Sequence, residues 1–128
     1  MDRKSYYRWL FVIGALSNWG TAVIFFIGYS YIFSMLNMKA LNYPVILQLS
    51  LSFVFVLGVG YYWVSKDINK NHDIVKLGIL AKTASFLLMF YYFISGDLPF
   101  LIFSTGIVDL LFAVLFVEFL LHWKIETR

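Results

Sequence analysis

Two residues of opposite charge lie in stretches of the sequence that are otherwise apolar. Lys82 lies within VKLGILAKTASFLLMF (75–90), and Asp109 lies within GIVDLLFAVLFVEFL (106–120). Ionisable side chains inside a membrane are rare, and they typically mark a binding site or a route for protons. A buried ion pair can also serve only to fix the register of two helices or to hold a partner subunit. The residues alone leave both interpretations open.

These two residues occupy matching positions on either side of a short turn. Counted outwards from Asp97 in the turn SGDLP, Lys82 is 15 residues away and Asp109 is 12 residues away. At about 1.5 Å of rise per helical residue, the two positions differ in depth by about 4.5 Å, which a lysine side chain can span. We therefore expect Lys82 and Asp109 to form an ion pair between two adjacent helices.

Two amides lie in the other apolar stretches, Asn18 at a depth comparable to that of the ion pair and Gln48 nearer the outer side. Asn18 shares a helical face with small residues of the first stretch, and Gln48 shares a face with Ser52 in the second stretch. Polar side chains of this kind form hydrogen bonds between membrane helices. The candidate intramembrane site is therefore a polar cluster of four residues, namely Lys82, Asp109, Asn18 and Gln48, with Gln48 nearer the outer side.

Glu118 is the other acid of the last apolar stretch. It lies nine residues beyond Asp109, and a helix turns through about half a revolution more than two full turns over that distance. We therefore expect Glu118 on the opposite face of the helix, where it reaches water or Lys124.

Residue sets that carry familiar catalytic or metal chemistry are missing from the sequence. The chain contains no cysteine, which excludes disulfides, thiolate metal sites and cysteine nucleophiles. His72 and His122 lie at the ends of apolar stretches, and there is no Ser–His–Asp set, metal-ligand spacing or phosphate-binding loop. We expect no cofactor, no metal and no catalytic residues.

The composition indicates a membrane protein. Of the 128 residues 62% are hydrophobic, 21% are aromatic and 13% are charged. A soluble domain of this length leaves a large share of its residues at the surface, and this sequence has too few polar residues to cover that surface. The length allows a single domain, residues 1–128.

Four apolar stretches are long enough to cross a bilayer, at about residues 9–29, 44–63, 74–94 and 98–121. About 20 residues of helix span a hydrocarbon core of about 30 Å, and within it the backbone must form its hydrogen bonds internally. The connectors KDINKNHD and SGDLP are short. The sequence predicts an all-α membrane protein, a bundle of four transmembrane helices built from antiparallel up-down hairpins.

The longer connector at about residues 30–43 has two interpretations. It could continue the first helix beyond the membrane, or it could lie along the membrane surface as a short amphipathic helix. We favour the interfacial helix, because the segment SYIFSMLNMKALNY is half apolar.

The basic residues predict the orientation. Cytoplasmic segments next to membrane spans are enriched in lysine and arginine. Lys39 lies alone on one predicted side, and eight basic residues lie on the other: Arg3, Lys4, Arg8, Lys66, Lys70, Lys76, Lys124 and Arg128. Both termini are therefore expected in the cytoplasm.

Several stretches resemble a group of small bacterial four-helix membrane proteins. They are RWLFVIGALSNWGTAVIFF near the start, GVGYYWVSKD and IVKLGILAK in the middle, and GIVDLLFAVLFVEFL near the end. This group in turn resembles the DoxX-like superfamily. The resemblance implies a multi-pass four-helix bundle in the bacterial inner membrane and assigns no chemistry. Sterol-isomerase-like proteins resemble the chain in size and layout, but they use membrane-buried acids and a histidine near the substrate, and this chain has no mid-membrane histidine.

The expected function is that of a small non-enzymatic membrane protein, either an accessory subunit or a binder of a lipophilic ligand. One alternative is a dimeric proton-coupled transporter, although Lys82 would compete there with a cationic substrate for Asp109, and Asn18 replaces the familiar glutamate of the first helix. A lipid- or sterol-modifying enzyme is the second alternative. Expected partners are membrane lipids, a lipophilic small molecule or a larger membrane complex, but no nucleic acid. The chain itself is expected to be a monomer or a weak homodimer.

Overall fold

A computed structural model describes residues 2–39 and 42–123, which fold into four α-helices. All four helices are long and apolar enough to cross a membrane. The predicted all-α architecture with four candidate spans is therefore confirmed. The helices are α1 (Arg3–Met35), α2 (Pro44–Lys66), α3 (His72–Ile94) and α4 (Phe100–His122).

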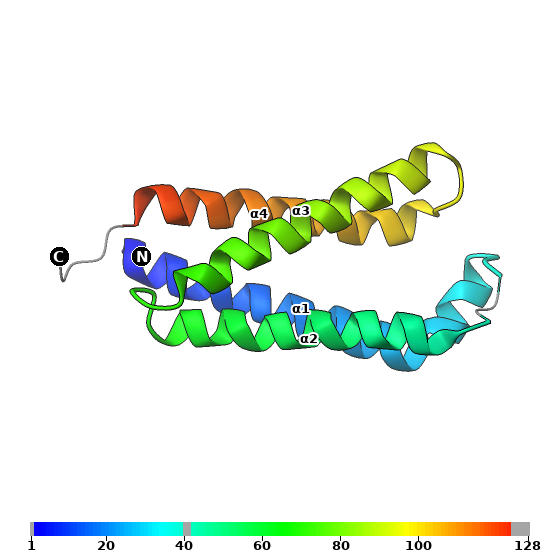
Figure 1. Cartoon of the computed structure of the whole chain (residues 1–128), viewed down its shortest axis with the longest axis horizontal. Helices are drawn as coiled ribbons and strands as arrows, with labels where there is room; N and C mark the ends of the chain where they lie inside the picture. Colours follow the sequence, from blue (N-terminus) through cyan, green and yellow to red (C-terminus); the bar gives the residue numbers. More distant parts are fainter. Residues whose placement is uncertain (1, 40–41, 124–128) are drawn as a thin grey trace.

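The helices run up and down and form two antiparallel hairpins, α1/α2 and α3/α4 (Figure 1). The start of α1, the connector between α2 and α3 and the end of α4 lie at one end of the molecule, which we call the terminal end. The connectors α1–α2 and α3–α4 lie at the opposite end, the distal end. Each hairpin packs closely along its own length, whereas contacts between the two hairpins are fewer.

The first helix is longer than the sequence analysis predicted. It continues without a break to Met35, so the favoured interfacial helix is wrong for residues 30–35. Residues 30–35 contain no glycine or proline to end the helix. The stop comes at Asn37, which adopts a left-handed conformation with φ 58°. Its N–H bonds to Ser34 O and the N–H of Met38 bonds to Phe33 O, the pattern of a Schellman cap.

The turn between α3 and α4 ends its helix in the same way. Gly96 has φ 84°, and its N–H bonds to Phe93 O while the N–H of Asp97 bonds to Tyr92 O. Glycine adopts this left-handed conformation without the steric cost of a Cβ atom. Pro99 directly precedes α4. The tight turn fixes the relative depth of the residues on the two helices of the second hairpin.

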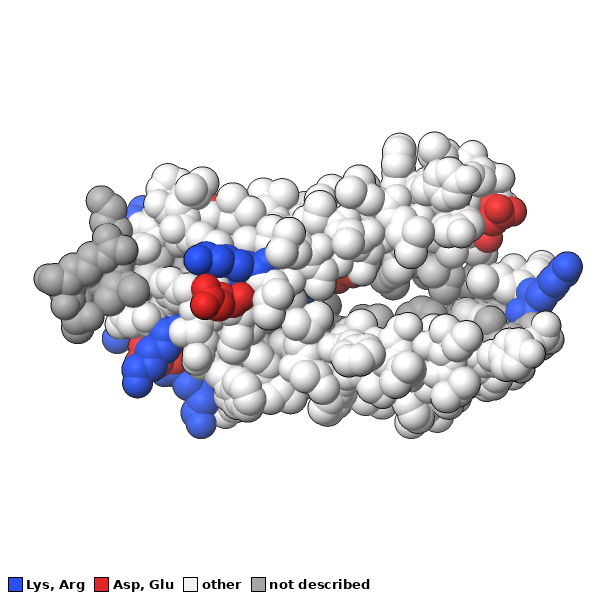
Figure 2. Space-filling view, in the orientation of Figure 1, with Lys and Arg blue, Asp and Glu red and all other residues white. Residues whose placement is uncertain are grey.

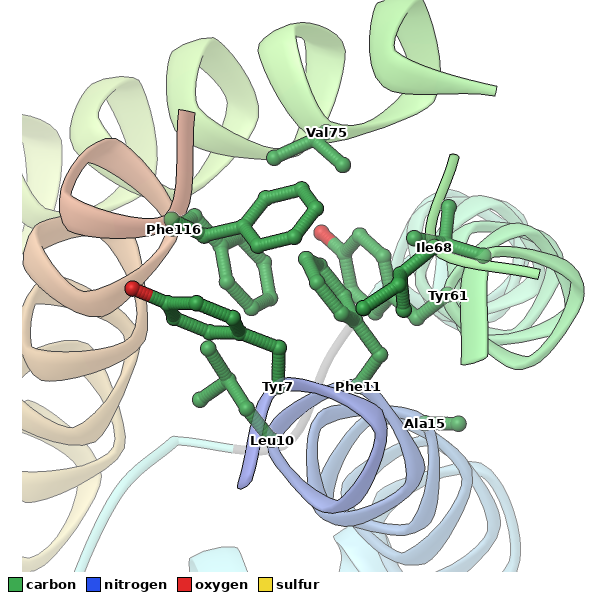
Figure 3. Close-up of a cluster of buried hydrophobic side chains, with 10 residues drawn as sticks. Tyr7, Leu10, Phe11, Ala15, Tyr61, Ile68, Val75 and Phe116 are labelled. Atoms are coloured by element: carbon green, nitrogen blue, oxygen red, sulfur yellow. The ribbon is translucent and has the colours of Figure 1, made fainter. Parts of the chain in front are cut away.

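The hydrophobic core lies in the terminal half and draws on all four helices (Figure 3). The rings of Phe11 on α1 and Phe116 on α4 stack with centroids 4.9 Å apart, and Tyr61 on α2 meets Phe116 edge to face at 5.1 Å. Val75 of α3 is fully buried in the same cluster. The cluster comprises Tyr7, Leu10, Phe11, Ala15, Tyr61, Val64, Ile68, Val75, Phe116 and Phe119. It holds the two hairpins together at this end.

In the distal half each hairpin packs mainly on itself. Phe103 of α4 stacks on Phe93 of α3 with centroids 4.4 Å apart, and Ala22 and Leu51 are buried on α1 and α2. Among the described residues, α3 has no buried side chain beyond Lys82 in this direction. Figure 2 shows the resulting hollow between the hairpins. We call this hollow the cleft.

Candidate functional site

Lys82 and Asp109 form the predicted ion pair. The Lys82 Nζ atom lies 3.0 Å from Asp109 Oδ1, so α3 and α4 are linked at this depth. Lys82 is 4% exposed. A single buried charge is costly, and a counterion beside it offsets part of that cost. The lysine within an apolar stretch is therefore explained by the aspartate on the next helix.

Asn18 joins the pair from the first hairpin, as predicted. Its Oδ1 accepts a hydrogen bond from Lys82 Nζ at 3.1 Å, and its Nδ2 donates to the backbone carbonyl of Val54 on α2 at 3.0 Å. An amide can satisfy a donor and an acceptor at once in this way. Through Asn18 these three residues, which we call the polar cluster from here on, connect all four helices.

Two aromatic rings lie beside the ammonium group of Lys82. Lys82 Nζ lies 5.4 Å from the centroid of the Tyr61 ring and 5.3 Å from that of Phe112. Such ring faces attract a cation in a nonpolar environment. The hydroxyl of Tyr61 is buried and has no hydrogen-bond partner among the described residues. This hydroxyl packs against Gly78 so closely that a Cβ atom there would lie 2.6 Å from it.

A small cavity of about 40 Å³ lies beside the pair. The two charged side chains differ in their exposure, because 29% of the Asp109 side chain is exposed but only 5% of that of Lys82. The carboxylate therefore forms the accessible side of the pair, and the ammonium forms the buried side. The cavity is lined by Asn18, Val54, Leu57, Tyr61, Ala81, Lys82, Ser85 and Asp109.

Gln48 lies apart from the other three predicted site residues. It is six residues before Val54 on α2, which is about 9 Å along the helix axis towards the distal end. Its backbone carbonyl accepts a hydrogen bond from the Ser52 hydroxyl at 2.9 Å. Gln48 is not among the residues that line the cavity.

Glu118 makes a contact that the sequence analysis did not predict. Its two carboxylate oxygens lie 2.8 and 2.7 Å from the Tyr7 hydroxyl on α1, so the acid is engaged with a neighbouring helix. Glu118 is half-buried, and its exposure to water stays a prediction. Lys124, the other expected partner, lies outside the described residues.

Tyr61 and Tyr7 are the residues of interest that the sequence analysis missed. Both are 1% exposed or less, although tyrosines near the ends of membrane spans usually lie at the membrane surface. The only signal for Tyr61 was its place beside Gly58 and Gly60, which allow close helix packing.

Within residues 2–39 and 42–123, no three His, Cys, Asp or Glu side chains lie together in a way that could hold a metal ion. The polar cluster can form hydrogen bonds and hold a charge pair, and it has an accessible acceptor in the Asp109 carboxylate. The chain matches no protein-family model, no curated protein and no solved structure. The resemblance to the DoxX-like superfamily therefore stays a prediction.

Proposed function

We propose that this chain is a non-enzymatic multi-pass protein of the bacterial inner membrane that binds a lipophilic small molecule in the cleft between its hairpins. The observation that supports this proposal is the position of the polar cluster. It lies where the packed terminal half gives way to the diverging distal half. Binding sites for small molecules are typically apolar hollows with a few polar groups that orient the ligand.

The exposure of the pair favours a binding role over a purely structural one. A ligand can reach an ion pair only where part of the pair is accessible from outside the helices. Here 29% of the Asp109 side chain is exposed, and a cavity adjoins it. Lys82 also counts against the transporter alternative, because a cationic substrate would have to displace an ammonium that lies 3.0 Å from the carboxylate.

The volume of the space at the distal opening of the cleft also supports entry of a ligand. Residues of the α1–α2 connector and of the α3–α4 turn border a space of about 630 Å³ there. Ser85 on α3 is exposed, and it lines the small cavity beside the ion pair. We propose that the chain acts as a monomer or weak homodimer.

Blocking the inner end of the cleft tests the proposal. We expect Ser85→Phe to lose most of the lipophilic material that copurifies with the wild-type chain from bacterial membranes, measured by mass spectrometry of an organic extract. Ala84→Phe is the matched control, because Ala84 is exposed on the same helix but is not among the residues that line the cavity. Equal retention by both variants would contradict binding in the cleft.

The proposed orientation has a separate test. The chain has no native cysteine, so single cysteines can be labelled without background. We expect cysteines at Asn42 and Asp97 to react with a membrane-impermeant maleimide in intact spheroplasts, and cysteines at Asn69 and Thr127 to react only after lysis. This follows from the excess of basic residues beside the termini and the α2–α3 connector. The reverse labelling pattern would refute the orientation.

A further inference from the structure

The polar cluster at the inner end of the cleft has no net charge. Lys82 and Asp109 balance each other at 3.0 Å, and Asn18 is neutral. A charged head group placed here would leave one uncompensated charge in a nonpolar environment, which is strongly unfavourable. The site therefore selects an uncharged head group.

The hydrogen bonds of the cluster leave one accessible acceptor. Asn18 uses both its oxygen and its nitrogen, and Lys82 donates to Asn18 and to Asp109 Oδ1. Asp109 Oδ2 has no hydrogen-bond partner among the described residues, and it belongs to the more exposed side chain of the pair. A carboxylate accepts hydrogen bonds but donates none. A ligand that satisfies it must bring an O–H or N–H donor.

Tyr61 also lines the cavity beside the ion pair. Its hydroxyl is fully buried against Gly78, and within the described part of the chain it neither donates nor accepts a hydrogen bond. The accessible polar group of the site is therefore the carboxylate, which needs a donor. A hydroxyl supplies a donor, whereas an ether or an ester only accepts.

The cavity beside the ion pair is small. Its volume is about 40 Å³, and a cavity needs about 10–15 Å³ of such space to hold one water molecule. A single hydroxyl with its carbon is small enough for this space. The hydrocarbon that carries the hydroxyl would then lie in the cleft, between the apolar walls of the two hairpins.

From these observations we propose that the ligand is an uncharged lipid alcohol whose hydroxyl donates a hydrogen bond to Asp109 Oδ2. This inference rests on the proposed function, because it names the class of molecule that occupies the cleft. Asp109 accepts from the ligand, Lys82 holds the carboxylate in place, and Asn18 in turn holds the Lys82 ammonium.

The test uses a long-chain alcohol with a photoreactive diazirine in its chain, applied to the full chain in lipid nanodiscs. Unlabelled 1-hexadecanol, its methyl ether, hexadecanoate and hexadecyltrimethylammonium serve as competitors. We expect hexadecanol to compete at least about tenfold better than the ether, which keeps the acceptor but lacks the donor. We expect both charged compounds to compete still less well than the ether.

Two variants separate this inference from the proposed function. The double variant Lys82→Met with Asp109→Leu removes the polar pair without leaving an isolated charge, and it should lose the preference for hexadecanol over the ether. Ser85→Phe should abolish labelling in the cleft, whereas Ala84→Phe should not.

Each outcome has a distinct meaning. In the first outcome, Ser85→Phe blocks labelling, but the alcohol and the ether compete equally well. This result would overturn the assignment of the head group, and the cleft would still be a binding site. Stronger competition by either charged compound would also overturn the assignment. Labelling that Ser85→Phe does not reduce would refute the proposed function and the inference together.

Discussion

Replacing Asp109 with asparagine is expected to lower the free energy of unfolding by about 3–5 kcal/mol, the range seen when one partner of a buried ion pair is removed. The ammonium of Lys82 would stay in place with 5% of its side chain exposed. Its remaining contacts, with Asn18 and with two aromatic rings, carry no negative charge. The lysine would then remain as an isolated charge in a nonpolar environment, which is unfavourable.

Replacing Lys82 with methionine should lower the free energy of unfolding by a smaller amount. Lys82→Met would leave the Asp109 carboxylate without its counterion, but 29% of that side chain is exposed. The carboxylate can be solvated in part from the cleft. We therefore expect a loss near 3 kcal/mol, at the low end of the range for broken buried pairs.

Replacing both residues together should recover much of the stability. Lys82→Met with Asp109→Leu leaves no isolated charge, so its cost should fall well below the sum of the two single changes. The measurement is reversible unfolding in mixed micelles, followed by helical circular dichroism. Lys76→Met is the control, because Lys76 is on the same helix and pairs with Asp73 at 3.4 Å on an exposed surface, where an ion pair contributes less than about 1 kcal/mol. Additive costs in the double variant would show that the two residues do not interact.

Gly78→Leu is expected to lower the free energy of unfolding by about 1–3 kcal/mol, the usual cost of overpacking a core. A Cβ atom at Gly78 would lie 2.6 Å from the Tyr61 hydroxyl and 2.7 Å from its ring. Tyr61 is fully buried against Phe116, so the ring has little room to move away. The two hairpins meet at this contact, and we expect the larger side chain to push them apart.

Gly20→Leu is the matched control for this prediction. Gly20 lies on α1, and a Cβ atom there would meet nothing within 4 Å. The same change should be neutral or should stabilise the helix, since leucine is favoured over glycine in helices by somewhat less than about 1 kcal/mol. The same unfolding experiment compares the two variants. Equal effects at the two positions would show that the approach of α3 to Tyr61 is not as close as described.

The ion pair could be predicted from the sequence because it depends only on local geometry. A short turn around Asp97 joins two helices, so the depth of Lys82 and Asp109 follows from counting residues on each side. Asn18 was placed at a comparable depth from its position within the first apolar stretch. The four spans followed from length and hydropathy, which suffice when the surroundings are apolar.

The errors and omissions come from contacts between the two hairpins. Helices that are apolar on all sides give little information about which face meets which neighbour. The contact between Glu118 and Tyr7, and the burial of Tyr61 against Gly78, depend on how the hairpins dock. The end of α1 was missed for a different reason, because the stop at Asn37 is a single left-handed residue in a segment without glycine or proline.

The division into two hairpins has a consequence for how the chain enters and leaves a membrane. Most close packing is between helices that are adjacent in the sequence, so each hairpin can assemble soon after its second helix is synthesised, without waiting for the other. Joining the hairpins through the terminal core is then the last step of assembly. Pulled mechanically from a bilayer by one end, the chain is expected to come out in two events, each extracting a pair of helices, because the docked surface between the pairs is the weakest part of the fold.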